Sequence, residues 1–577
     1  MEGAFEVTED IKTSCLVCNG SLEESEYFTQ FKVCPHCKFH YSLSALVRIS
    51  MIVDEGTFRE ISRGVVSIDP IGFSPKESYK TVIQREQKRT SLSEGVITGT
   101  CEIGGNPAVI IVFDFGFMSG SVGCVVGEKI TLAIERSVRM NVPLIAVVTS
   151  SGSRIEEGLL SIMQMAKISM AIDSLENKDI PFISILANPT TGQAYASFAA
   201  RADFIFAEPG SVIGLSPLGL MNESKKHKQL SDQLISNYTS ENLFETGMID
   251  MVVDRENHRS ILAHIMGLLS MSNRIKKRKT SIQPSRKKDV DAWKSVSLAR
   301  IKNRPTARQY IDAIGNRFFE IHGDRVNNDD SSVTLGIAEL SGQSVIVIGQ
   351  ERYSDVKQPV KTINSITPEM FRKIQRGIRL AEKFKLPLLS FIDISDVETS
   401  LSAEQGGLAV EVGKTISQMA QLNSPSISII IGEIGGEASL PLVVADRVLM
   451  LEHSVFSVTL LEDAASLIFQ DANKAEELAK WFKLTALDCQ KFGVVDYIVQ
   501  EPVLGAHTNI KEVSFDLIRI LISTLAELQS KSSRRLLRER KNRFRKVGEY
   551  NSKVKAIVYQ EFVGIQQLLS RKFNDRK

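Results

Sequence analysis

The sequence has no long hydrophobic run, few cysteines and almost no net charge. Its 577 residues are 43% hydrophobic and 24% charged, yet its longest apolar stretches, such as 426–431, are far too short to span a bilayer. The N-terminus is acidic and lacks an apolar targeting stretch, so no export signal is visible and we expect a cytoplasmic protein. These absences exclude a membrane protein, and the length predicts more than one domain.

The net charge of +2 is unevenly distributed along the chain. Basic residues gather in two segments, 274–288 and 531–546, and the remainder carries an acidic excess. A uniformly basic nucleic-acid binder would not show this pattern, so a nucleic-acid partner is not expected. We expect a solvated basic linker at 273–291 and a basic helical tail at 531–577 that is solvated or contacts a partner.

Four of the seven cysteines have the spacing of a metal site. Cys15 and Cys18 form one Cys-x2-Cys turn, and Cys34 and Cys37 form a second turn after fifteen intervening residues. Each turn aims two thiolates at one point, and four thiolates complete a closed tetrahedral shell for Zn²⁺. The spacing predicts a structural zinc ribbon within residues 1–45. Zinc ribbons often bind nucleic acid, but the spacing alone does not support that role.

The rest of the chain contains one pattern used twice. Two pairs of prolines, each 38 residues apart, mark the two copies: Pro143 with Pro181, and Pro387 with Pro425. An aspartate follows the second proline of each pair, after 22 residues in the first copy (Asp203) and 21 in the second (Asp446). A match of spacing and residue type at an offset of about 240 residues indicates a duplicated domain.

Each copy alternates β-rich runs with turns and helices. Hairpin patterns are expected at 95–114 and 335–349, where two β-rich runs flank a glycine-containing turn. Further strands are expected at 144–149 and 182–186 in the first copy, and at 388–392, 427–431 and 448–452 in the second. This rhythm predicts an α/β fold whose parallel strands carry ligand-facing turns at their C-terminal ends.

Motifs along both copies support a specific resemblance. The first copy contains FDFGFMSGSVGCVVG at 113–127, LSIMQMAK at 160–167 and NPTTG at 188–192. The second contains RPTARQY at 304–310, IHGDR at 321–325 and GAH at 505–507. Together with the ribbon, these motifs resemble the acetyl-CoA carboxylase carboxyltransferase family, as a beta-subunit-like half fused to an alpha-subunit-like half.

The resemblance implies a fold, a reaction and a set of partners. It implies two crotonase-like ββα-repeat domains of the ClpP/crotonase superfamily, a CoA-side domain at 46–272 and a biotin-side domain at 292–530. The implied reaction moves a carboxyl group from carboxybiotin on a carrier protein to acetyl-CoA or a related acyl-CoA, giving malonyl-CoA. Biotin carboxyl carrier protein and biotin carboxylase are the implied partners. A homodimer is expected because the two kinds of half must meet across an interface.

The family chemistry implies stabilisation of a thioester enolate and of the biotin ureido oxygen. Backbone N–H groups at glycine-rich turns suit this task, and released biotin can itself take the proton. The candidate catalytic donors are Gly152, Ser153, Gly435 and Gly436. The candidate substrate-binding residues are Gly120, Gly123, Arg154, Thr191, Gly192 and Glu437.

Both candidate turns depart from the family pattern. The first, SGSR at 151–154, is one residue shorter than Ser-Gly-Gly-Ala-Arg, and Gly192 is followed by Gln193 instead of a second glycine. The second turn brings in the carboxylate of Glu437, and the nearby segment 393–400 lacks the glycines and prolines of the family. A displacement of ~1 Å at such a site can cost on the order of a hundredfold in rate.

These departures leave three interpretations open. The first is a carboxyltransferase with altered turns. The second is a repurposed, biotin-independent enzyme that decarboxylates, hydrolyses or condenses an acyl-CoA or acyl-carrier-protein thioester through an enolate, with Glu437, Asp396 or Glu398 as candidate acid/base groups. The third is an inactive scaffold or regulator that uses its ribbon and basic segments to bind nucleic acid or partners.

Overall fold

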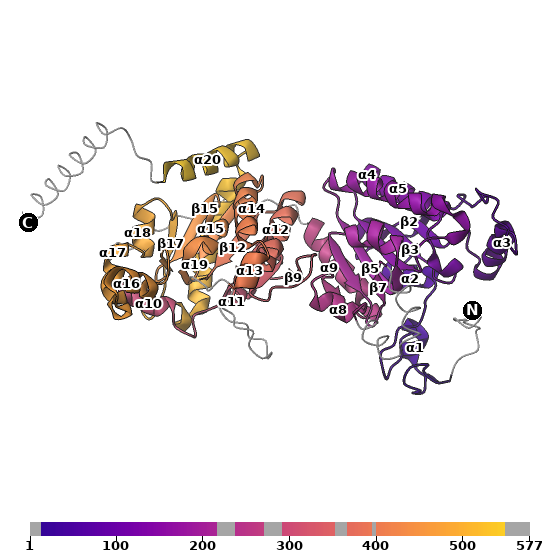
Figure 1. Ribbon diagram of the computed structural model, residues 1–577, viewed down its shortest axis with the longest axis horizontal. Coiled ribbons are helices and arrows are strands. Elements are labelled where there is room, and N and C mark those ends of the chain that lie inside the picture. The colour runs from indigo at the N-terminus through magenta and orange to yellow at the C-terminus, as the bar shows by residue number, and fades with distance from the viewer. Residues whose placement is uncertain (1–12, 216–236, 271–290, 352–365, 395–399, 548–577) are drawn as a thin grey trace, which may run out of the picture.

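The computed structural model describes residues 13–215, 237–270, 291–351, 366–394 and 400–547. They form a small N-terminal ribbon and two α/β halves that lie side by side along the long axis of the molecule (Figure 1). No helix within these ranges has the length and apolar character needed to cross a membrane.

The described residues of the first half form an eight-stranded sheet, in the order β1-β2-β3-β4-β5-β6-β8 with β7 paired to β5. The strands are β1 (Arg59–Ile61), β2 (Val96–Ile103), β3 (Asn106–Phe113), β4 (Leu144–Ser150), β5 (Phe182–Thr191), β6 (Phe204–Ala207), β7 (Ile213–Gly214) and β8 (Met251–Val252). The expected antiparallel hairpin and parallel strands are confirmed. β5 extends beyond its expected end at 186.

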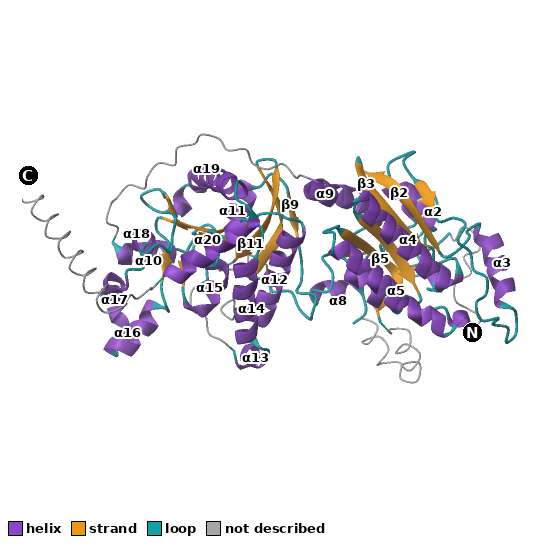
Figure 2. Cartoon of the chain, turned by 90° about the horizontal axis from the view of Figure 1, so that it is seen from above, coloured by secondary structure: helices purple, strands orange, loops and turns teal. Residues whose placement is uncertain are grey.

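Helices cover both faces of this sheet (Figure 2). One face packs against α4 (Cys124–Met140) and α5 (Leu159–Glu176), and the other against α2 (Ala45–Ile52) and α9 (His258–Ser270). Strands covered on both faces have continuous apolar runs, as in 108–113. The other helices of this part are α1 (Glu26–Phe31), α3 (Tyr79–Thr90) and α8 (Ser240–Glu245).

The second half repeats the plan with a seven-stranded sheet, in the order β17-β15-β13-β12-β11-β10-β9. Its strands are β9 (Phe318–Glu320), β10 (Val333–Leu340), β11 (Gln343–Gln350), β12 (Leu388–Ile392), β13 (Ser426–Ile430), β15 (Arg447–Leu451) and β17 (Tyr497–Val499). β14 (Glu433–Ile434) and β16 (Val455–Phe456) form a separate parallel pair. The described part of the chain therefore contains two similar sheets, as the resemblance to a crotonase-like fold implies.

Helices again cover both faces of the second sheet. α12 (Pro368–Lys383) and α14 (Leu408–Gln421) cover one face, and α11 (Ala307–Ile314) and α19 (Ile510–Gln529) cover the other. The remaining α-helices are α10 (Ala292–Ala299), α13 (Leu401–Gln405), α15 (Gly436–Val443), α16 (Leu461–Phe469), α17 (Ala475–Phe482), α18 (Ala486–Lys491) and α20 (Ser533–Lys546).

The spaced prolines have the same role in both halves. Each proline carbonyl accepts a backbone N–H from the adjacent strand. The four bonds run from Val109 to Pro143 (3.0 Å), Leu144 to Pro181 (2.9 Å), Ile346 to Pro387 (2.8 Å) and Leu388 to Pro425 (2.9 Å). The spaced aspartates are equivalent as well, because Asp203 accepts the N–H of Phe182 and Asp446 that of Ser426, each at 2.9 Å. The duplicated pattern is therefore a duplicated fold.

The two halves meet at a seam between the β6/β8 edge of the first half and β9 and α12 of the second. The ring of Phe204 on β6 lies 5.9 Å from that of Phe319 on β9 and 6.0 Å from that of Phe384, centroid to centroid. Ser344 donates a hydrogen bond to the carbonyl of Leu268 at 2.6 Å. One apolar core cluster contains residues of both halves, so the seam is an extension of the interior.

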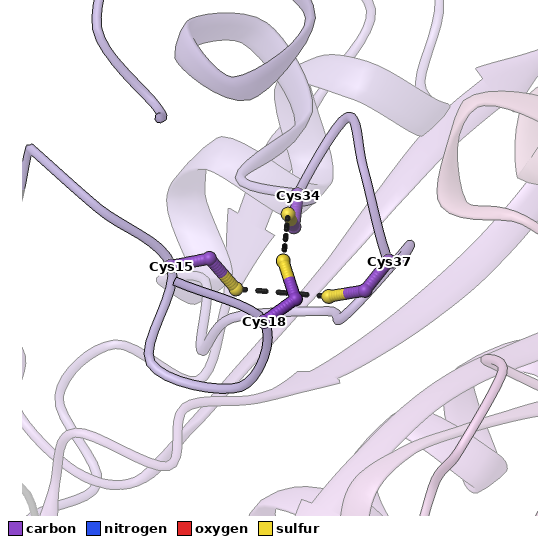
Figure 3. Close-up of side chains that lie close together, drawn as sticks. All are labelled: Cys15, Cys18, Cys34 and Cys37. Atoms are coloured by element: carbon purple, nitrogen blue, oxygen red, sulfur yellow. Dashed lines mark hydrogen bonds between the residues drawn. The ribbon is translucent and has the colours of Figure 1, made fainter. Parts of the chain in front are cut away.

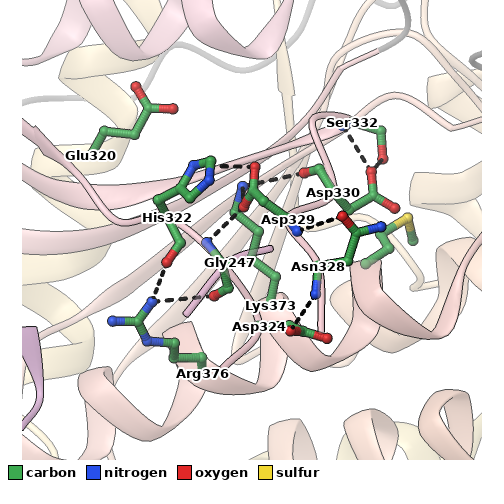
Figure 4. A network of polar contacts seen from close by, with 12 residues as sticks. Gly247, Glu320, His322, Asp324, Asn328, Asp329, Asp330, Ser332, Lys373 and Arg376 are labelled. Atoms are coloured by element: carbon green, nitrogen blue, oxygen red, sulfur yellow. Dashed lines mark hydrogen bonds and ion pairs between the residues drawn. The ribbon is translucent and has the colours of Figure 1, made fainter. Parts of the chain in front are cut away.

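The IHGDR motif lies at this seam (Figure 4). His322 bonds the carbonyl of Phe244 at 2.8 Å, and its carbonyl accepts an N–H of Arg376 at 2.6 Å. A Cβ atom on Gly323 would lie 2.0 Å from the carbonyl oxygen of Gly247, so the two backbones come together where no side chain fits. The motif thus joins the halves.

The basic segment at the C-terminus differs from expectation. We expected a basic helical tail at 531–577 that is solvated or contacts a partner, but α20, the helix within its described residues, packs against the second half. Arg540 is 2% exposed and pairs with Asp446 at 2.8 Å, and Leu536 is also buried. A solvated helix is therefore wrong for this face, because the arginine neutralises a buried carboxylate. The expected linker at 273–291 lies outside the described residues except for its last position.

Candidate functional site

The four cysteines of the ribbon converge on one point (Figure 3). Their Sγ atoms all lie within 4.8 Å of one another. Cys15 and Cys37 are 3.6 Å apart, and Cys18 and Cys34 are 3.7 Å apart, so each close pair joins the two turns. A tetrahedral Zn²⁺ with bonds of about 2.3 Å holds its sulfurs at roughly this separation. The predicted four-cysteine cluster is confirmed, and its geometry fits zinc.

A buried ion-pair cluster attaches the ribbon to the first half. Arg255 donates to the ribbon carbonyls of Phe31 at 2.7 Å and Tyr41 at 3.0 Å, and to Glu208 at 2.8 Å. Arg48 pairs with the same carboxylate at 2.6 Å. Burial opposes ionisation of Glu208, but the charges of Arg48 and Arg255 outweigh it and hold the pKa of Glu208 well below its usual range. Sequence reasoning missed this cluster.

The turn at 151–154 follows β4 and pairs with the segment after β3. Val122 donates its N–H to the carbonyl of Gly152 at 2.8 Å, and Arg154 donates its backbone N–H to the carbonyl of Val122 at 3.0 Å. Gly152 has φ +108°, a conformation that favours glycine. The turn is therefore held like a short piece of parallel strand, with Ser153 opposite Val122.

The two predicted donors of this turn differ in their bonding. The N–H of Gly152 donates to the hydroxyl of Ser150 at 3.0 Å. Ser153 is exposed, and its N–H has no hydrogen-bond partner among the described residues. The candidate oxyanion donor in the first half is therefore Ser153.

The predicted substrate-binding glycines surround the end of β4. A Cβ atom on Gly192 would lie 2.8 Å from the Cα atom of Gly152, so these backbones touch directly. A Cβ atom would meet the Thr149 carbonyl at 2.3 Å from Gly120, and the Glu157 carboxylate at 2.5 Å from Gly123. The glycines thus allow close packing of the loops after β3, β4 and β5.

Thr191 and Arg154 are buried at the same place. The hydroxyl of Thr191 donates to the carbonyl of Ser150 at 3.0 Å. Arg154 is fully buried and all five N–H groups of its guanidinium are donated to protein atoms. Their acceptors are the Glu94 carboxylate (2.8 Å, twice), the Tyr79 hydroxyl (3.1 Å), and the Ser121 hydroxyl (3.1 Å) and carbonyl (2.8 Å). The guanidinium has no N–H left for a substrate.

Sequence reasoning missed the groups behind the turn. Tyr79 lies on α3, and its hydroxyl donates to Glu157 at 2.7 Å. Glu157 also accepts the first N–H of α4, from Cys124, at 2.5 Å. The apolar spacing of Tyr79 and Ile83, one helical turn apart and both buried, is the signal that could have identified α3.

The second candidate turn is bonded differently from the first. The N–H of Gly435 donates to the carbonyl of Ile394 at 3.1 Å, and that of Gly436 to the carbonyl of Val458 at 3.1 Å. Both predicted donors are therefore already paired. Glu437 lies exposed in the first turn of α15. The other two candidate acid/base residues, Asp396 and Glu398, lie outside the described residues.

Two arginines form ion pairs and hydrogen bonds beside this second turn. Arg300 forms paired bonds with Glu433 (2.7 and 2.8 Å) and with Glu462 (2.6 and 3.1 Å). Arg304 donates to the carbonyl of Ile431 at 2.6 Å and pairs with Glu501 at 2.7 Å. The turn is fixed by ion pairs, of which Arg304–Glu501 is fully buried as Arg154–Glu94 is beside the first turn. The first turn follows β4 of the first half and the second precedes α15 of the second half, so the two turns lie on separate halves.

Comparisons with known proteins identify the family. A family model described as acetyl co-enzyme A carboxylase carboxyltransferase-like matches residues 244–548. The acetyl-coenzyme A carboxylase carboxyl transferase subunits beta/alpha protein of Clostridium tetani is 36% identical over 546 residues, covering 94% of each chain. Its counterpart from Natranaerobius thermophilus is 35% identical, covering 95% of this chain and 93% of the relative.

A solved structure supports the fold. The crystal structure of transcarboxylase 12S with methylmalonyl-coenzyme A and methylmalonic acid bound superposes with a TM-score of 0.67 at 19% identity. The match covers 85% of this chain and 90% of that one, so both halves share the crotonase-type architecture. The long matches to fused beta/alpha relatives, together with the family model, show that this chain belongs to the acetyl-CoA carboxylase carboxyltransferase family.

Proposed function

We propose that this protein moves a carboxyl group from carboxybiotin on a carrier protein to acetyl-CoA or a related acyl-CoA, giving malonyl-CoA or its homologue. The observation that carries the proposal is the open N–H of Ser153 on a rigid turn of a carboxyltransferase-family chain. A fixed donor of this kind stabilises an enolate oxygen without reorganisation.

In this proposal the first half holds the acyl-CoA. The thioester oxygen lies at the Ser153 N–H and gains negative charge as the methyl carbon loses its proton. Gly152 and Gly192 let the loops approach closely enough to form the site, since a Cβ atom on Gly192 would collide with Gly152. Arg154 acts as a positioning residue, because its five donors bind protein atoms behind the turn. Gly120, Gly123 and Thr191 belong to the same proposed acyl-CoA site.

The second half is the proposed biotin side. The N–H groups of Gly435 and Gly436 are bonded to other backbone groups. We therefore assign the ureido oxygen to the next N–H groups in the first turn of α15, from Glu437 and Ala438, which an α-helix leaves unpaired. Released biotin takes the acyl proton, so this half needs no side-chain base.

The paired state of Gly435 and Gly436 also favours a second candidate function. In a biotin-independent enzyme, the first half would still form an enolate from an acyl-CoA or acyl-carrier-protein thioester, and Glu437 would act as an acid or base. The substrate would then be decarboxylated, hydrolysed or condensed, and no carboxybiotin would be formed.

One experiment separates these functions. The full-length protein is incubated with malonyl-CoA labelled in its free carboxyl group, with or without a biotinylated carrier protein. Carboxyl transfer predicts acetyl-CoA formation that depends on biotin, with label on the carrier. Release of CoA or CO2 without biotin dependence would favour the second function. No reaction of malonyl-CoA, with or without the carrier protein, would contradict both functions.

We further propose that the four cysteines hold one structural Zn²⁺. Their side chains supply four thiolates, which fill a tetrahedral shell and leave no position for a substrate or water. The ion would therefore stabilise the ribbon and take no part in carboxyl transfer.

We infer that two chains assemble as a homodimer to complete the site. Exposed apolar side chains lie along α5, which begins five residues after the turn at 151–154: Leu159 (72%), Ile162 (53%), Met163 (53%) and Met170 (66%). Leu401 and Val410 are similarly exposed on α13 and α14 of the second half. Exposed apolar surface of this kind marks an interface, and a second copy turned end for end would pair these faces.

The homodimer has a direct test. Met163→Glu places a charge in the proposed interface, and we expect a monomer by light scattering and loss of carboxyl transfer. Val47→Glu is the matched control, because Val47 is a partly exposed residue of α2 on the opposite face of the first sheet. A dimer that survives Met163→Glu would contradict the proposed interface.

A further inference from the structure

Gln193 is a buried amide with no role in the reaction described above. It follows Gly192 and precedes the short helical turn Ala194–Phe198. Its side chain is almost fully buried, and its Nε2 donates to the carbonyl of Val122 at 3.0 Å and to the hydroxyl of Ser161 at 3.1 Å. Its Oε1 is buried and has no hydrogen-bond partner among the described residues.

The carbonyl of Val122 is where these contacts meet. It accepts three donors: the backbone N–H of Arg154 (3.0 Å), the hydroxyl of Ser161 (2.7 Å) and the amide of Gln193 (3.0 Å). The hydroxyl of Ser161 also accepts the N–H of Arg154 at 2.9 Å. Gln193 is therefore one corner of a closed network that fixes Val122 relative to the turn.

The position of Val122 sets the direction of the open donor. Ser153 N–H belongs to the same planar peptide group as the carbonyl of Gly152, and in a trans peptide these two groups point in opposite directions. That carbonyl accepts the N–H of Val122 at 2.8 Å. The Ser153 N–H therefore points away from Val122, and any movement of Val122 redirects it.

We propose that Gln193 is a positioning residue that aims the Ser153 N–H at the thioester oxygen. This inference rests on the proposed function. Losing the Nε2 donor leaves the Val122 carbonyl with two donors and lets the turn shift. Misplacement of a catalytic group by ~1 Å can cost on the order of a hundredfold in rate. The loss should appear in kcat more than in KM, because the oxygen gains its charge in the transition state.

The unpaired Oε1 sets the expected effect of replacing Gln193 on stability. A buried acceptor without a partner lowers stability, and replacing the amide by an apolar group of the same length removes that cost. Gln193→Met should therefore leave Tm unchanged or raise it while lowering turnover. A residue present only for stability would lower Tm when replaced.

The chain offers a matched control in Gln164. This residue of α5 is also buried, its Nε2 donates to the carbonyl of Leu160 at 3.0 Å, and its Oε1 has no partner among the described residues. It has no hydrogen bond to residues 151–154 in the described structure. Gln164→Met removes the same kind of buried amide without touching the turn.

Steady-state carboxyl transfer, Tm and hydrogen exchange of residues 151–158 are compared in the full-length wild type, Gln193→Met and Gln164→Met. We expect kcat of Gln193→Met to fall by about ten- to a hundredfold, KM for the acyl-CoA to stay within about twofold, and exchange across 151–158 to rise. Gln164→Met should keep wild-type kcat, KM and exchange, with Tm unchanged or raised as in Gln193→Met. Wild-type kcat and exchange in Gln193→Met, or equal losses in both variants, would overturn the proposal.

The exchange measurement keeps the two hypotheses apart. A wild type without biotin-dependent transfer contradicts the proposed function alone. Faster exchange across 151–158 in Gln193→Met, with no change in Gln164→Met, would still support the positioning of the turn by Gln193, and unchanged exchange would contradict it.

Discussion

Arg376 of the second half and Asp250 of the first form a buried ion pair, with Nη2 of the arginine 2.9 Å from the carboxylate. The same guanidinium donates to the carbonyl of Asp203 at 3.0 Å. Asp250 also accepts the N–H of Ile205, at the start of β6, at 2.8 Å. One carboxylate therefore joins a sheet edge to the helix α12 that covers it.

The second half repeats this arrangement with a different helix. Arg543 of α20 lies 2.6 Å from the carboxylate of Asp496 and donates to the carbonyl of Asp446 at 3.2 Å. Asp496 accepts the N–H of Val448 at 2.7 Å, as Asp250 does that of Ile205. α20 thus covers the second sheet edge as α12 covers the first.

Arg376→Met should weaken the seam. Removing one partner of a buried pair costs about 3–5 kcal/mol, because a buried charge loses its compensation. Arg325, which also pairs with Asp250, will reduce this loss toward the lower value. The free energy of unfolding from urea titration measures the change. Arg379→Met, an exposed position on the same helix, should have no effect, and equal stability of both variants would contradict the role of Arg376.

Gly192→Ala should lower activity through steric displacement of the turn. Its Cβ atom would lie 2.8 Å from the Cα atom of Gly152, and the residue has φ +63°. We expect a loss of about a hundredfold in kcat/KM, measured as biotin-dependent acetyl-CoA formation. Gly210→Ala is the control, because it has φ +66° but no atom within 4 Å of its new Cβ. A similar loss in both variants would point to backbone strain instead.

Stability should fall in mild acid because of His258. Burial lowers the pKa of this imidazole from 6.5 to about 4, with Glu208, Arg48 and Arg255 as its charged neighbours. Below pH 6.5 the unfolded state binds a proton at His258 that the folded state does not bind. The stability that the neutral imidazole allows is therefore fully present above pH 6.5 and is lost as pH falls toward 4. The loss reaches at most about 3 kcal/mol.

The difference between wild type and His258→Leu isolates this contribution from the other histidines. We expect the difference between their unfolding free energies to change by up to about 3 kcal/mol between pH 6.5 and 4, because only the wild type has the titrating group. A constant difference across that range would mean that His258 titrates normally in the folded protein.

Cys34→Ser should remove zinc and unfold the ribbon. Binding of a structural Zn²⁺ contributes on the order of 10 kcal/mol to small domains, and three thiolates hold the ion less tightly than four. Metal analysis should find about one zinc per wild-type chain and less in the variant. Cys489→Ser, a buried cysteine outside the cluster, should retain zinc. Full zinc content in Cys34→Ser would contradict the site.

The sequence was sufficient to predict features that depend on local spacing. The two Cys-x2-Cys turns predicted a cluster that the structure confirms, and the proline spacing predicted the duplicated strands. The structure places the glycines at 120, 152 and 192 close together at the end of β4, and their roles in catalysis and substrate binding stay predictions.

Features that depend on distant segments could not be predicted. Gly435 and Gly436 looked like free donors, but their N–H groups bond carbonyls of Ile394 and Val458, which other loops bring to them. Arg154 looked like a substrate ligand, yet its partners Tyr79 and Glu94 come from 60 residues or more upstream. The spacing of residues in a motif says nothing about such partners.

The position of α20 has a consequence for assembly. The edge of the second sheet carries Asp496, as the edge of the first sheet carries Asp250. In the first half this edge binds α12, a helix of the second half. An edge of this kind left open could receive a helix from another molecule, and head-to-tail contacts that do not close produce filaments. By filling the edge from within, α20 closes it to a helix from another molecule.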